Sequence, residues 1–215
     1  MKGEKIYMIS SAEARLGKNM ALLGAILIVV GMALGFLGGE GGSRDSNPQL
    51  ALLADLIDFV NNLTLIVVIM YSLKLFNLDE APFIKVIGNV AIIGVTIAML
   101  TDLSPALSAA GFASESQGFT PAEVSEIGEA VQSGTWIVMP LFVLLVSAKF
   151  RGDPIPSWGA WGGILAGSLI LLMHVIALSG LAPDLEVIWP IWLVAGLIGF
   201  PLFALGMSRA FASKI

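Results

Sequence analysis

Long apolar runs alternate with short polar segments along the whole chain. A helix needs about 20 mainly apolar residues to cross the hydrocarbon core of a bilayer. Six runs meet this requirement, and turn-forming segments such as "RGDPIP" separate them. They are residues 20–38, 56–76, 82–102, 131–149, 157–179 and 187–208. The pattern predicts an all-α polytopic membrane protein whose transmembrane domain, residues 20–208, is a bundle of six transmembrane helices.

The composition agrees with this class. Hydrophobic residues make up 57% of the chain and charged residues 13%, which is more apolar surface than a soluble domain of 215 residues can bury. There is no cysteine, so disulfides and thiolate metal sites are excluded. The first apolar run is longer than the core of a signal peptide, and we expect it to be a retained membrane helix.

The basic residues predict the orientation. With a cytoplasmic N-terminus, ten of the eleven Lys and Arg residues lie on the inner side, and only Arg44 lies outside. This is the positive-inside bias, and it predicts that both termini, including a tail at 209–215, are cytoplasmic. The outer side is acidic, either as a solvated surface or as an entrance that collects cations. Without a Lys/Arg-rich run, nothing indicates a nucleic-acid partner.

Two short helices are expected outside the spans. Ser10 and Glu13 form a capping box, which predicts a short helix within the cytoplasmic N-terminal segment 1–19. In the loop between helices 3 and 4, Thr120 as N-cap and Pro121 at the first helical position predict a short outer amphipathic helix.

A faint repeat relates two hairpins. "SLKLFNLDEAP" joins the second and third spans, and "VSAKFRGDPIP" joins the fourth and fifth. Two interpretations stay open: an internal duplication, or the independent requirements of two short inner turns, namely a snorkelling Lys and a helix-starting Pro.

Few polar groups inside the spans could carry chemistry. The only histidine, His174, lies in the outer third of the fifth span. Asp58, Asn61 and Asn62 lie at comparable depth in the second span, which runs the opposite way. We therefore expect these four residues to form a ligand-binding pocket, with Asp58 or Asn62 within hydrogen-bonding reach of His174.

Each of these groups also has a plainer explanation. His174 is a neutral hydrogen-bonded contact between helices, a ligand-contacting or ion-contacting group, or an axial ligand of haem or chlorophyll. Bis-histidine haem is excluded, since the chain has one histidine. Asp58 and Asn62 either cap a solvated helix start or face a pocket that opens outward, and Asp55 is expected at the outer surface. No catalytic residue, metal site or cofactor is indicated.

The positions of glycine, proline and tryptophan predict how the helices pack, bend and meet the membrane interfaces. Gly159, Gly163 and Gly167 recur every four residues, which allows close helix contact in lipid and turns His174 toward the bundle interior. Pro140, Pro190 and Pro201 are expected to kink their helices. Tryptophans are expected at the two membrane interfaces, Trp158 and Trp161 inside and Trp136, Trp189 and Trp192 outside.

The layout resembles a group of uncharacterised six-helix bacterial membrane proteins, catalogued only as a domain of unknown function. The features in common are the length, the long outer loop between helices 3 and 4, and "PSWGAWGGILAG" followed by "IWPIWLVAGLIGFPLFALG". The resemblance implies the bacterial inner membrane as the location, and it gives no functional residues.

The sequence favours a non-enzymatic membrane subunit or self-associating bundle. Its partners would be the lipid bilayer and other copies or other membrane subunits, and its outward-opening pocket would bind a small or amphiphilic ligand. The alternative is a small channel or carrier for a neutral or cationic solute. Charge-poor spans favour the first hypothesis.

Overall fold

The regular structure of the chain is helical. The computed structural model describes residues 9–37, 48–102, 137–179 and 185–215. Its helices are α1 (Ser11–Leu37), α2 (Pro48–Leu75), α3 (Pro82–Asp102), α6 (Val138–Lys149), α7 (Ser157–Leu178), α8 (Leu185–Val194) and α9 (Phe200–Ala212). Within these ranges there is no strand, only an isolated bridge between Arg151 and Ile155. The all-α prediction is confirmed.

Within the described ranges, five helical stretches are long and apolar enough to cross a membrane. They are Ser11–Leu34, Leu52–Leu75, Pro82–Thr101, Ser157–Ile176 and Pro190–Ala212. A shorter apolar helix, α6, corresponds to the predicted fourth span, whose first residues, 131–136, lie outside the described ranges. The loop in which we predict the outer amphipathic helix also lies outside them.

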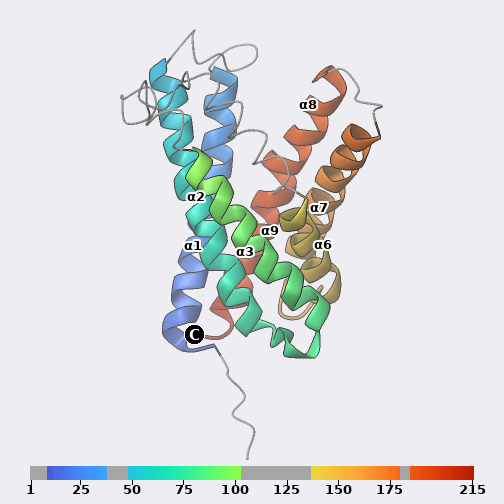
Figure 1. Cartoon of the computed structure of the whole chain (residues 1–215). Helices are drawn as coiled ribbons and strands as arrows, with labels where there is room; N and C mark the ends of the chain where they lie inside the picture. The colour runs from blue at the N-terminus through green and yellow to red at the C-terminus, as the bar shows by residue number, and fades with distance from the viewer. Residues whose placement is uncertain (1–8, 38–47, 103–136, 180–184) are drawn as a thin grey trace, which may run out of the picture.

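The long helices form a closed ring in chain order (Figure 1). α1 packs against α2, α2 against α3, α3 against α6, α6 against α7, and α7 against α9; α9 then returns to α1. Buried apolar side chains such as Val68, Phe142 and Phe203 fill the interior. Since α2 and α7 stand across the ring from one another, residues at equal depth on these two helices need not meet.

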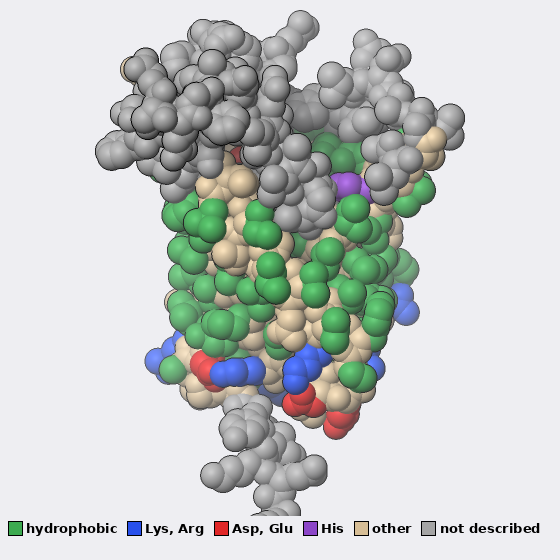
Figure 2. Space-filling view, in the orientation of Figure 1, with side chains coloured by type: hydrophobic (Ala, Val, Ile, Leu, Met, Phe, Trp, Pro, Cys, Tyr) green, Lys and Arg blue, Asp and Glu red, His purple; other side chains and the backbone are tan. Residues whose placement is uncertain are grey.

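The outer surface carries a broad apolar belt (Figure 2). On α3, for example, Phe83, Ile93 and Leu100 are each more than 60% exposed. Basic side chains gather at the lower end of the belt, where α1 begins and α2, α6 and α9 end. This is a membrane-embedded surface with one basic end.

The two tryptophans that we predict at the inner interface lie at the basic end. Trp158 and Trp161 are exposed near the start of α7. The guanidinium of Arg151 lies 4.9 Å from the centroid of the Trp161 ring, a cation–π contact. This pairing suits an interface between apolar chains and a charged surface.

The N-terminal capping box is confirmed. Ser10 N–H donates to Glu13 Oε2 at 2.9 Å, and Glu13 N–H donates to Ser10 Oγ at 3.3 Å. The helix that begins there is α1 itself, so the predicted separate helix within 1–19 is wrong. A good N-cap and the absence of proline before residue 20 let one helix run from Ser11 into the span. Glu13 also forms an ion pair with Lys74 at the end of α2.

The two turns at the basic end meet, but their backbone conformations differ. Phe76 and Phe150, which occupy matching positions of the proposed repeat, stack with ring centroids 4.3 Å apart. The first turn contains Asn77 at φ 46° and a 3-10 turn, Leu78–Glu80. The second contains Gly152 at φ 95° and a cis Asp153–Pro154 bond. Duplication of the hairpin stays a prediction.

A π-helical segment, Ala195–Gly199, joins α8 to α9. The amide of Phe200 donates to the carbonyl of Ala195, five residues back, and Pro201 follows directly. Proline lacks an amide hydrogen, so a helix commonly deviates from regular α geometry beside it. The deviation predicted at Pro201 is therefore present, as a widened turn just before it.

Candidate functional site

The glycine face of α7 is a tight structural contact. A methyl group added to Gly159 would meet Gly206 Cα at 2.5 Å, so the backbones of α7 and α9 touch. A methyl group on Gly167 would lie 2.7 Å from Pro140 O on α6. The predicted close packing along this ladder is confirmed, and it leaves no room for a ligand there.

His174 bonds to its own helix. Its Nδ1 lies 2.8 Å from Ile170 O, and the side chain is half-buried. A carbonyl oxygen only accepts, so Nδ1 carries the hydrogen in this bond. Figure 2 shows the single histidine (purple) at the molecular surface, among apolar side chains of the upper half.

The polar residues of α2 face several environments. Asn62 is 4% exposed and Asp55 is 9% exposed, whereas Asp58 is exposed and Asn61 is partly buried. The burial of Asp55 corrects the expectation that it is a solvated surface group. A residue near the start of a membrane helix can therefore be covered by protein.

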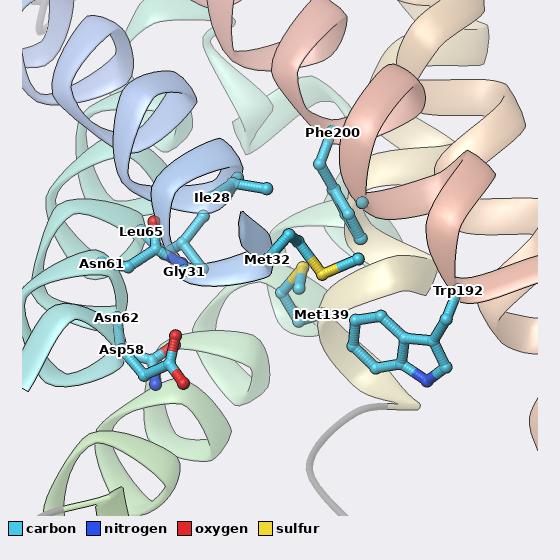
Figure 3. A pocket seen from close by; sticks show the side chains of 11 residues that line it. Ile28, Gly31, Met32, Asp58, Asn61, Asn62, Leu65, Met139, Trp192 and Phe200 are labelled. Atoms are coloured by element: carbon cyan, nitrogen blue, oxygen red, sulfur yellow. The ribbon is translucent and has the colours of Figure 1, made fainter. Parts of the chain in front are cut away.

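A cavity of about 300 Å³ lies between α1, α2 and the α8–α9 helix. Its polar wall is Asp58, Asn61 and Asn62 from α2 (Figure 3). The facing wall is apolar, aromatic and sulfur-rich, and is made by Met32, Met139, Trp192 and Phe200. Three of the four predicted site residues therefore line one cavity. His174 is not among the described residues that line it.

One glycine on α1, Gly31, and one in the π segment, Gly196, line this cavity. Gly31 faces Asp58, whose Oδ1 would lie 3.3 Å from an added methyl group. Gly24, two turns earlier, faces Thr64 Oγ1 at 2.8 Å by the same measure. A methyl group added to Gly196 would lie 3.1 Å from Met32 Cε. π segments in helices occur frequently at functional sites, and this one places Gly196 at the cavity.

The cavity lies in the half of the bundle away from the basic end. Asp58 precedes Lys74 by 16 residues, roughly 24 Å at ~1.5 Å per residue. Trp192 precedes Arg209 by 17 residues, roughly 26 Å. The depth predicted for the polar set agrees with this position.

One atom of the polar wall lacks a partner. Within the described part of the chain, Asn61 Oδ1 is buried and has no hydrogen-bond partner. The Asn61 carbonyl, in contrast, accepts from Thr64 Oγ1 at 2.7 Å. A buried amide oxygen without a donor costs free energy, and a ligand donor could remove that cost.

The apolar wall of the cavity is absent from the sequence prediction. Met32, Met139 and Phe200 look like ordinary span residues, and Trp192 is assigned by sequence to the outer interface. In the structure Trp192 is half-buried and lines the cavity, and its place at the outer interface stays a prediction. The spacing of Trp192, Gly196 and Phe200, four residues apart, was the available signal, since it gives one helix face.

No family model, curated protein or solved structure matches this chain. The resemblance to six-helix bacterial membrane proteins stays a prediction. Among the described residues there is also no group of three or more His, Asp or Glu side chains that could hold a metal ion. The site must therefore be interpreted from its own chemistry.

Proposed function

We propose that this protein is a non-enzymatic integral membrane protein that binds a small amphiphilic ligand in the cavity between α1, α2 and the α8–α9 helix. The observation that carries the proposal is the division of the cavity into two walls, one with Asp58, Asn61 and Asn62 and one with Trp192, Phe200 and two methionines. Binding pockets commonly combine an apolar lining with a few convergent polar groups, and 300 Å³ suits a small ligand.

The proposal includes six spans in a bacterial inner membrane, with both termini in the cytoplasm. Five long apolar helices and the apolar α6 support the count, and the basic end of the belt supports the orientation. The chain has no cysteine, so single cysteines introduced at Lys214 and at Asp79 can be tested for labelling by an impermeant reagent. Labelling of either one from the outside of intact cells would contradict this orientation.

Association with other copies or with other membrane subunits is a further part of the proposal. The apolar belt and the exposed face of α3 are the surfaces that a neighbouring helix could cover. Native mass spectrometry of the protein released from its own membrane tests this. A strictly monomeric species with no partner chain would remove that part of the proposal.

The channel or carrier alternative has weaker support. A transport path should continue from the cavity toward the basic end as polar positions. Below Leu65 the described ring interior is filled by Val68, Ile69 and Phe142. Ser72 is buried there, but its hydroxyl donates to Val68 O at 2.6 Å, within its own helix.

A cavity-filling variant tests the proposed function. In Gly196→Leu the new side chain enters the cavity against the flexible end of Met32, so the fold is expected to tolerate it. Ser168→Leu, at an exposed position on α7, is the matched control. Small molecules that copurify with the wild type and with Ser168→Leu, identified by mass spectrometry, should be lost from Gly196→Leu. An identical set in all three proteins would contradict the proposal.

A further inference from the structure

The charge of the cavity is one-sided. Of the eleven described residues that line it, Asp58 is the only ionisable one. The basic residues of the described chain lie at the other end of the helices, roughly 24 Å away along α2 at ~1.5 Å per residue. A carboxylate beside a cavity favours a cationic ligand group over an anionic one. The described lining therefore offers an acidic group to a ligand and no basic one.

The polar wall presents hydrogen-bond acceptors. Asp58 supplies a carboxylate on the rim of the polar wall, turned toward the cavity (Figure 3). Asn61 supplies the buried Oδ1 that lacks a donor among the described residues. Both oxygens are hydrogen-bond acceptors, and bonds from a charged donor are the stronger kind.

The facing wall suits an apolar body close to a positive charge. Trp192 and Phe200 present aromatic rings across the cavity from Asp58 (Figure 3). Indole is the best of the aromatic side chains at attracting a cation over its face. Met32 and Met139 are flexible thioether side chains that adapt to ligand shape.

We infer that the ligand is a small protonated amine with an apolar tail. Its ammonium group donates to Asp58 and to Asn61 Oδ1, and its tail lies against Trp192, Phe200 and the two methionines. This inference rests on the proposed function, since it names the ligand class of the same cavity. The inference distinguishes a protonated amine from a quaternary ammonium, which carries the charge but has no N–H group to donate to Asn61 Oδ1.

Direct binding of n-hexylamine tests the inference. The full chain is placed in phosphatidylcholine nanodiscs, and saturable binding of tritiated n-hexylamine is measured. Unlabelled n-hexanol, hexanoate and hexyltrimethylammonium serve as competitors of equal tail length. We expect n-hexanol and hexanoate to compete at least about tenfold more weakly than n-hexylamine, since neither provides a cationic N–H donor.

Variants assign the effect to the two acceptors. Asp58→Asn should weaken n-hexylamine binding about ten- to hundredfold, the range for loss of a charged hydrogen bond. Asp79→Asn, which removes a carboxylate at the basic end of the molecule, is the matched control and should leave binding unchanged. Asn61→Leu should weaken binding of n-hexylamine several-fold and leave hexyltrimethylammonium unaffected.

The outcomes separate this inference from the proposed function. If n-hexanol or hexanoate competes as well as n-hexylamine, and binding is lost in Gly196→Leu, the cavity is a ligand site and the amine class is wrong. If n-hexylamine does not bind saturably, or binds equally well to Asp58→Asn, the inference is also overturned. The copurification comparison with Gly196→Leu then decides the proposed function independently.

Discussion

Two helix contacts in this molecule contain glycines, but the glycines face different groups and the packing differs. Between α7 and α9, Gly159 and Gly206 bring two backbones together, and the contact is closed. Between α1 and α2, Gly24 and Gly31 instead face the polar atoms Thr64 Oγ1 and Asp58 Oδ1. The first arrangement holds helices together in lipid, where packing has to replace the hydrophobic effect. The second accommodates polar side chains and ends at a cavity.

The difference shows what a small residue can do in a membrane. A glycine opposite another glycine increases the area of contact between helices. A glycine opposite a polar side chain gives that side chain a place inside the bundle, at the cost of looser packing. A site in such a protein is therefore to be sought where glycines face polar groups, as along α1.

The largest expected effect is on the closed contact. Gly159→Val places side-chain atoms where the Gly206 backbone lies, so α7 and α9 must separate. We expect a loss of about 3 kcal/mol or more in the free energy of unfolding. The measurement is denaturation in mild detergent, with Ser168→Val on the exposed face of α7 as the control. Equal stability of the two variants would break the comparison.

A smaller change on α1 should affect ligand binding more than stability. In Gly31→Ala the added methyl group lies 3.3 Å from Asp58 Oδ1 and 3.5 Å from Ile57 Cγ2, so only small shifts are needed. We expect a change in unfolding free energy within about 1 kcal/mol and a several-fold weaker affinity for n-hexylamine. A large loss of stability with unchanged affinity would mean that α1 and α2 form a closed contact as well.

Two variants at the start of α1 separate the contribution of its N-cap to stability from that of its ion pair with α2. Ser10→Ala removes the N-cap of α1 and should cost about 1 kcal/mol of unfolding free energy. Glu13→Gln keeps the capping-box geometry and removes only the ion pair with Lys74. Since that pair is partly exposed, its loss should cost less than the loss of the cap. A greater loss for Glu13→Gln than for Ser10→Ala would reverse this order.

The smallest expected effect concerns His174. Its ring bonds to Ile170 O on the same helix and does not line the cavity among the described residues. His174→Ala should therefore leave n-hexylamine affinity unchanged within about twofold, because no ligand contact is removed. A tenfold loss of affinity would mean that His174 contacts the ligand, and it would contradict the separation of α2 from α7.

The sequence predicts the fold class and the depth of the polar groups well, for a physical reason. Hydropathy locates the helices, and residue number along a helix gives height at a fixed rise. It does not tell which helices are neighbours. His174 and Asp58 are predicted at similar height, but the helices pack in a ring in which α7 and α2 are not neighbours.

The sequence also does not show which direction each residue faces around its helix axis. Trp192 fits an interface belt by height alone, and only the packing of α8 shows that it faces the cavity. Asp55 fits a solvated helix start by height alone, yet it is buried. In apolar helices the usual signal for rotation, a polar face against an apolar one, is weak because lipid and protein interior are both apolar.

The most direct test of the central claim is photoaffinity labelling. A hexylamine analogue with a diazirine in its alkyl chain is bound to the full chain in phosphatidylcholine nanodiscs, irradiated, and mapped by peptide mass spectrometry. The account predicts labelling of cavity residues, foremost Met32, Met139 and Trp192, that excess n-hexylamine suppresses. Labelling confined to α7 around His174, or spread over the exposed apolar belt and insensitive to n-hexylamine, would contradict it.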